Sequence, residues 1–206
     1  MCILLLACVW SWSPRVDAAQ IALPQCSDNG ADHQRAAIKN QPALANLTVP
    51  SSRRIDVSRM LTWRVPVNIP SDQWDSDDPL IKRERDRLLY ALTGYVRLVK
   101  LETDCDFHVQ VAQSPNIASA QVIVEVPRQF DEVQRELMRI LGMTDGQRSK
   151  TWKPQPPPKV QFVGFAFLDA PHQSNPPTKE GHGHGPAGVV QTLWELHPVV
   201  NVRLLQ

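Results

Sequence analysis

Hydrophobic and polar residues alternate in two short stretches of the second half of the chain, "DCDFHVQVAQ" and "AQVIVEVP". A period of two is typical of a β-strand that buries one face. The apolar positions are Phe107, Val109 and Val111 in the first stretch and Val122, Val124 and Val126 in the second. These two stretches are therefore predicted to be strands, with His108 and Glu125 on the faces opposite to the valines.

A strand is also predicted before these two, and a helix after them. In "GYVRLVKLE", Tyr95, Arg97 and Val99 alternate against Val96, Leu98 and Lys100. In "DEVQRELMRILGMTDG", apolar side chains recur at helical spacing, at Val133, Leu137, Ile140 and Leu141. Gly142 is suited to end that helix.

Two more strands are predicted near the C-terminus. "VQFVGFAFLDAP" contains Gly164, where a barrel strand can bend sharply. "LWELHPVVNVRLL" places a set of apolar residues on one face, and its Pro198 indicates an edge position or a bulge. The members of that set are Trp194, Leu196, Val200, Val202 and Leu204.

The order strand, strand, strand, helix, strand, strand is that of an OB-like Greek-key barrel with five strands. We expect this barrel in residues 81–206, preceded by an irregular arm and linker in residues 19–80. Another small β-sandwich or barrel is the competing fold. The ligand face of an OB-fold lies on strands two and three, between the loops that join strands one to two and four to five.

Composition narrows the function classes only slightly. The 206 residues carry a net charge of +1, which gives no overall attraction to nucleic acid or membranes. The 18 prolines exceed the average share of about 5% and favour extended segments over a helical bundle.

The N-terminus, "MCILLLACVWSWSPRVDAAQ", has an apolar run shorter than the roughly 20 residues that span a bilayer. We expect residues 1–18 to be a signal peptide cleaved after Ala18, and the protein to be exported to the periplasm or beyond, with no transmembrane span in the mature chain. The usual basic start is missing, which indicates either an upstream start codon or a weak signal. With an upstream start, "LLAC" ending at Cys8 would be a lipoprotein box; a buried N-terminal strand is the alternative.

Removal of residues 1–18 leaves two cysteines, Cys26 and Cys105. In an oxidising compartment an even pair indicates a disulfide, here between the arm and the barrel. Two free thiols are the alternative.

Four segments together resemble an uncharacterised family of exported bacterial proteins with an OB-fold-like domain and a terminal Glu-Leu-His-Pro-Val strand. They are "KLETDCDFHVQVA", "VIVEVP", "VGFAFLDAPH" and "LWELHPV", within residues 90–204. The resemblance implies export but no particular activity. The segment from Asp169 to Leu193 is longer here than in shorter members, so its added histidines depart from the pattern.

The strand order brings polar residues together on the outer face of three adjacent strands, because strand three lies beside both two and five. They are His108, Glu125, Glu195 and His197. We expect Asp104 and Asp106 to approach from one loop, and Asp169, His172, His182 and His184 from the other.

Imidazole nitrogens and carboxylate oxygens make this cluster a candidate site for a divalent metal such as zinc. The metal ligand candidates are His108, Glu125, Asp169, His172 and His197; the wider ligand-binding candidates are His108, Glu125, Glu195, His197 and Asp106. The alternatives for the cluster are a cross-strand ion pair and metal-free acid–base catalysis by a His–Glu pair. For His182 and His184 the alternative is a flexible loop, and for Asp104 and Asp106 it is a role as simple turn carboxylates.

Three functions follow as hypotheses. The first is a binding module for a small ligand, a glycan or a metal; the second is a metal-dependent hydrolase related to phosphodiesterases or nucleases; the third is a structural envelope protein. The chain has no G-x-S-x-G motif and no glycine-rich phosphate loop. The acidic face disfavours nucleic-acid binding, which uses basic residues interleaved with exposed aromatics.

Overall fold

The computed structural model describes residue 26 and residues 52–65, 88–116, 118–148, 150–169 and 190–206. The predicted signal peptide and the histidines at positions 172, 182 and 184 lie outside these residues.

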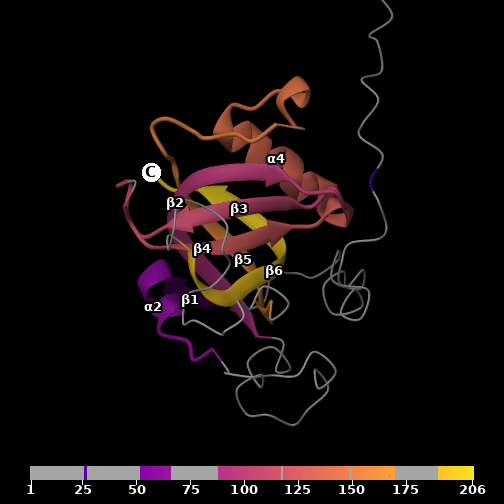
Figure 1. The fold of residues 1–206 in the computed structure, drawn as a ribbon. Coiled ribbons are helices and arrows are strands. Elements are labelled where there is room, and N and C mark those ends of the chain that lie inside the picture. The colour runs from indigo at the N-terminus through magenta and orange to yellow at the C-terminus, as the bar shows by residue number, and fades with distance from the viewer. Residues whose placement is uncertain (1–25, 27–51, 66–87, 117, 149, 170–189) are drawn as a thin grey trace, which may run out of the picture.

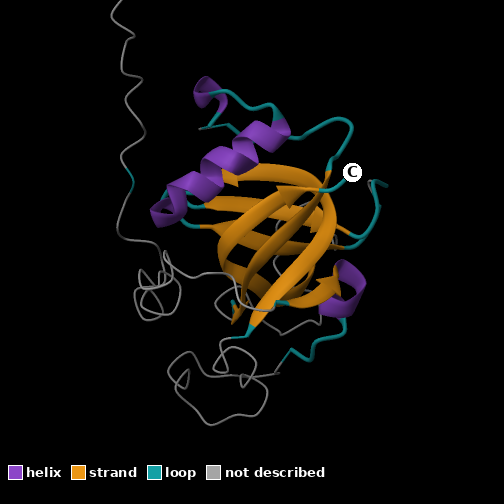
Figure 2. Cartoon of the chain, turned by 180° about the vertical axis from the view of Figure 1, so that it is seen from behind, coloured by secondary structure: helices purple, strands orange, loops and turns teal. Residues whose placement is uncertain are grey.

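The described residues form a closed barrel of five strands, which confirms the predicted fold class (Figures 1 and 2). The strands are β2 (Leu89–Leu101), β3 (Phe107–Ala112), β4 (Gln121–Val126), β5 (Lys159–Leu168) and β6 (Val190–Leu204). They pair in the order β2-β3-β4-β6-β5, and β5 pairs again with β2 to close the barrel. The β4–β6 pair is parallel, whereas the other pairs of the barrel are antiparallel.

The alternating valines of β3 and β4 fill the barrel, as predicted. Val109 pairs with Val124, and both are fully buried in the main core. On the opposite face, His108 pairs with Glu125. Val124 also pairs with Leu196 of β6, so the polar faces of β3, β4 and β6 form one surface of the sheet.

The helix α4 (Asp131–Leu141) lies between β4 and β5 and packs Leu137 and Leu141 against the barrel. It ends at Gly142, whose φ of 63° is the left-handed conformation that glycine adopts at low cost. Both features confirm the predicted helix and its end. Short 3-10 helices flank it at η2 (Arg128–Phe130) and η3 (Asp145–Gln147).

Part of the expected irregular arm is ordered against the barrel. The strand β1 (Arg53–Asp56) pairs in parallel with β2, and α2 (Val57–Leu61) follows it directly. The Asp56 side chain accepts a hydrogen bond from the Arg59 backbone N–H, which caps the start of α2. Figure 1 shows α2 on the side of the barrel away from α4. Val57, Met60 and Trp63 join the main core.

Bulges change which residues face the core, and two of the predicted faces are wrong for this reason. In β2, Arg97 is an extra residue in the pairing with β3, so Val96 and Val99 are both buried in the core. In β6, Leu196 and Val199 both face the core, so the alternation changes by one position between them. Leu204, also predicted on the core face, is the last residue of β6 and is 51% exposed. A strand with an inserted residue shifts its alternation by one position, and the sequence pattern alone does not mark where this occurs.

Cys26 and Cys105 form a disulfide, as the sequence predicted. It ties residue 26 to the loop between β2 and β3, across 79 positions of the chain. Across the described ranges, every helix falls short of the length and apolar character needed to span a bilayer.

Candidate metal centre

A row of three polar side chains crosses three adjacent strands. Glu125, on the middle strand β4, lies between His108 on β3 and His197 on β6. Its Oε1 is 3.3 Å from His108 Nδ1, and its Oε2 is 2.7 Å from His197 Nδ1. The register of the barrel therefore brings together residues that are 17 and 72 positions away from Glu125 in the sequence.

Asp106 joins this row from the loop between β2 and β3. Its Oδ1 accepts a hydrogen bond of 3.0 Å from the Arg128 backbone N–H, and its Oδ2 is 3.8 Å from His197 Nε2. Asp106, Glu125 and His197 each offer one ligand atom, and these three atoms all lie within 4.8 Å of one another. A single cation placed among them would be in reach of all three.

The cluster is buried, which corrects the expectation of an open ligand face. His108, Glu125, Glu195 and His197 were predicted on the outer surface of the sheet, yet all four are buried, and His197 is only 1% exposed. Asp106 is also buried. The outward direction of a side chain on a strand does not make it accessible, because other parts of the chain can cover that face.

His197 has an unusual environment for a buried histidine. Neither of its ring nitrogens makes a hydrogen bond, although carboxylate oxygens lie near both. The 2.7 Å contact with Glu125 is thus a close approach in which the oxygen lies away from the direction of an Nδ1–H bond. The ring of His197 therefore lies between two carboxylate oxygens, one 2.7 Å from Nδ1 and the other 3.8 Å from Nε2.

The Asp106 carboxyl is strongly affected by its surroundings. Burial raises its pKa from 3.8 to about 6, and the charges of Asp104 and Glu125 add to the rise. His197 and the hydrogen bond from the Arg128 backbone act in the opposite direction. A carboxyl whose pKa lies near neutrality and that faces another carboxyl is common in functional sites.

Other predicted residues lie at the edge of the cluster or outside the described residues. Glu195 Oε2 is 4.0 Å from His197 Nδ1, and Asp169 is buried at the end of β5. Asp104 accepts a hydrogen bond from the Asp106 backbone N–H, the role expected of a turn carboxylate. The predicted candidates at positions 172, 182 and 184 are not among the described residues.

Two residues near the site were not singled out from the sequence. Glu102 Oε1 is 4.0 Å from His108 Nδ1 and also accepts a hydrogen bond from Lys100. Gln134 of α4 is fully buried and hydrogen-bonds to the backbone beside Asp106. The sequence marks Gln134 only as a polar residue between the apolar positions 133 and 137 of the predicted helix. Polar residues at such positions are usually exposed, so the pattern did not single it out.

The donor set suits a divalent ion. Two carboxylate oxygens and one imidazole nitrogen are ligands that zinc accepts, and three protein ligands leave room for a water molecule. Comparisons with protein-family models and with curated protein sequences gave no match. The chemistry of this site is therefore interpreted from its own geometry.

Proposed function

We propose that this protein is a metal-binding module of OB-like fold that holds a divalent cation with Asp106, Glu125 and His197. The observation that carries the proposal is the convergence of their three ligand atoms within 4.8 Å around a buried imidazole that makes no hydrogen bond. In this reading, His108 is a supporting residue, since it contacts Glu125 through Oε1 and leaves Oε2 on the side of His197.

Zinc is the ion that this donor set favours. Calcium takes six to eight oxygen ligands, and magnesium keeps several waters and rarely uses imidazole. Zinc and, more weakly, manganese accept a mixed set of nitrogen and oxygen ligands. Zn²⁺ is therefore expected to bind more tightly than Mn²⁺, and Ca²⁺ and Mg²⁺ least tightly.

The disulfide supports the expected export of the protein. Disulfides form and persist mainly outside the reducing cytosol, and this one joins the Cys26 region to the barrel. For this reason we propose that the protein resides in an oxidising compartment, which is also what the apolar N-terminal run predicts.

The proposal is tested by metal content and titration calorimetry on the purified 206-residue chain, after removal of bound ions with a chelator. The wild type should take up one Zn²⁺ per chain. The variants Asp106→Asn, Glu125→Gln and His197→Gln should each weaken binding by at least about 100-fold, because each removes one of three protein ligands.

Two variants serve as controls. Glu136→Gln removes an exposed carboxylate on α4 that is paired with Arg139, and Thr192→Val alters a buried polar residue of β6. Both should bind Zn²⁺ like the wild type. If no ion binds and the three ligand variants only lower stability, the row of charged residues is an ion-pair network and the metal proposal is wrong.

A further inference from the structure

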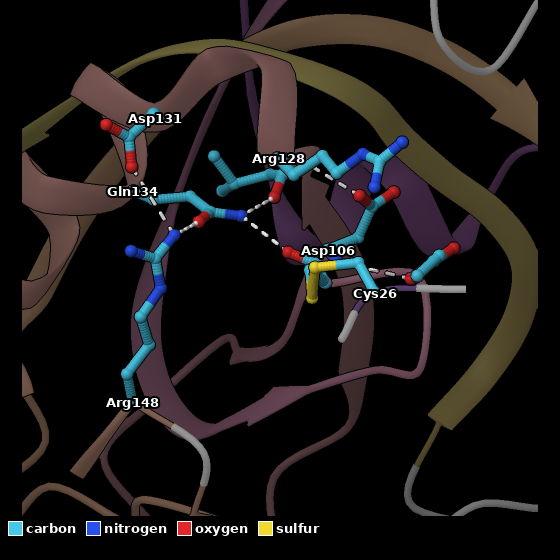
Figure 3. Close-up of a disulfide and its surroundings, with 9 residues drawn as sticks. Cys26, Asp106, Arg128, Asp131, Gln134 and Arg148 are labelled. Atoms are coloured by element: carbon cyan, nitrogen blue, oxygen red, sulfur yellow. Dashed lines mark hydrogen bonds and ion pairs between the residues drawn. A yellow bond between two sulfur atoms is a disulfide. The ribbon is translucent and has the colours of Figure 1, made fainter. Parts of the chain in front are cut away.

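Gln134 joins the backbone segments that carry the two carboxylate ligands. Its Nε2 donates hydrogen bonds of 3.0 Å to the Cys105 carbonyl and 2.8 Å to the Val126 carbonyl. Cys105 directly precedes Asp106, and Val126 directly follows Glu125. One side-chain amide therefore holds β4 and the β2–β3 loop together, next to the residues that carry the two carboxylates. Figure 3 shows Gln134 beside the loop that carries Asp106.

The orientation of this amide is itself determined by its neighbours. Gln134 is fully buried, and its Oε1 accepts a hydrogen bond from Arg148 Nη2. The same guanidinium lies 3.4 Å from Asp131 Oδ1 and 5.6 Å from the centre of the Phe107 ring. With its oxygen engaged by Arg148, Gln134 must direct its NH₂ group toward the two carbonyls (Figure 3).

The disulfide constrains the backbone of the β2–β3 loop, which contains Cys105. Cys105 has a φ of 67°, a left-handed conformation that side chains other than glycine rarely adopt. The turn is closed by hydrogen bonds from Cys105 N–H to the Glu102 carbonyl and from Glu102 N–H to the Asp106 carbonyl. A residue in such a conformation persists only where the surroundings enforce it, and the bond to Cys26 is one of those constraints.

We propose that the Cys26–Cys105 disulfide and the Gln134 amide form a clamp that positions Asp106 and Glu125 for the cation, so that ion affinity depends on the redox state of the disulfide. The inference rests on the proposed function, since it concerns the same ion. Cleavage of the disulfide by a phosphine and one water transfers two electrons and yields two thiols and a phosphine oxide. Without the bridge, the loop is free to leave its left-handed conformation, and Asp106 moves with it.

The test is the Zn²⁺ dissociation constant, measured by competition with a chelating dye. All proteins carry Cys2→Ser and Cys8→Ser, so that no other thiol binds the ion. On this background, the Cys26→Ser/Cys105→Ser double variant removes the bridge and leaves no thiol. Gln134→Glu keeps the size of the side chain and an oxygen for Arg148, but it loses the NH₂ donors.

Both variants should bind Zn²⁺ roughly 10- to 100-fold more weakly than the disulfide-bonded protein, the usual effect of losing a group that orients a metal ligand. Thr192→Val is the control for stability alone: it loses the hydrogen bond from the Trp194 backbone N–H, and its affinity should not change. The visible absorption of the Co²⁺-loaded proteins gives a second readout. It should shift in the two clamp variants, because the coordination of the ion changes, and remain unchanged in Thr192→Val.

The possible results separate the two proposals. A disulfide-bonded protein that binds no Zn²⁺ overturns both the metal site and the clamp. Zn²⁺ binding with the same dissociation constant and the same Co²⁺ spectrum in all the proteins overturns the clamp alone and leaves the metal site standing. Weaker binding in both clamp variants, with Thr192→Val unchanged, supports the clamp.

Discussion

Asp106 is the acidic residue on which several interactions of the candidate metal centre meet. It receives a backbone hydrogen bond, faces an imidazole at 3.8 Å, and lies beside two other carboxyl groups in a buried setting. A buried carboxylate is costly unless nearby groups offset its lost hydration. In the metal-free protein that cost is lowered by proton binding, whereas a cation would lower it in the loaded protein.

This residue predicts a pH dependence of stability for the metal-free protein. The pKa of Asp106 is about 6 in the folded state and 3.8 as its ordinary value, so the folded state binds the proton more tightly. The stabilising contribution is therefore fully present below about pH 3.8 and is lost as the pH rises through 6. Urea unfolding with a chelator present should show a loss of up to about 3 kcal/mol over this window, superimposed on the other titrations.

Asp106→Asn should remove this contribution, because the amide does not titrate. Its unfolding free energy should fall less steeply between pH 4 and pH 6 than that of the wild type, whereas Thr192→Val should keep the wild-type slope. Identical slopes for Asp106→Asn and the wild type would show that Asp106 titrates normally.

At the scale of elements, the polar row depends on the bulges of β6. Leu196 pairs with Ala166 and Val199 with Gly164, so His197 and Pro198 lie opposite the single residue Phe165. A bulge bends the strand and changes the direction of its side chains. Gly164 permits the close approach of β5 and β6 at this point.

Gly164→Ala is therefore expected to destabilise the barrel. A Cβ at this position would lie 2.8 Å from the Pro198 carbonyl oxygen and 3.1 Å from Val199 Cα, so backbone atoms would have to move. The expected loss is about 1–3 kcal/mol in the free energy of unfolding, measured by urea denaturation. Gly146→Ala is the matched control, because the nearest atom to its Cβ would be 4.0 Å away. It should change stability by less than about 0.5 kcal/mol; equal effects of the two substitutions would contradict the role given to Gly164.

These elements also show how far the sequence allowed prediction. Period-two alternation located β3 and β4, and with the OB-like strand order it placed His108, Glu125 and His197 in one row, which the contacts confirm. The bulges were not predictable, because an inserted residue leaves no compositional mark, and so Val199 was missed as a core residue. Gln134 was missed for a different reason: its role depends on carbonyl groups of two other elements, which become its neighbours only in the folded chain.

At the scale of the whole molecule, chain-distant segments meet around the β2–β3 loop. The loop touches α4 through Gln134, contacts β6 through Asp106, and is covalently joined to residue 26. Segments on the other side of the barrel, around α2, pack into the same core: Trp63 contacts Trp194 edge to face, and the Trp194 indole N–H donates to the Arg64 carbonyl. Residues well before the barrel strands therefore belong to its folding unit.

The disulfide should accordingly stabilise the whole fold as well as the loop. It links positions 79 residues apart, and a bridge that closes a loop of this length reduces the entropy of the unfolded chain by an amount worth up to about 4–5 kcal/mol. Cys26→Ser should lower the unfolding free energy by an amount approaching this value, measured by urea denaturation with a chelator present and with a phosphine to keep the remaining thiols reduced. Oxidised Cys2→Ser, measured without phosphine, removes a cysteine outside the bridge and should match the oxidised wild type. A loss below about 1 kcal/mol for Cys26→Ser would mean that the bridge constrains the β2–β3 loop without adding to global stability, since chain entropy alone requires a larger effect.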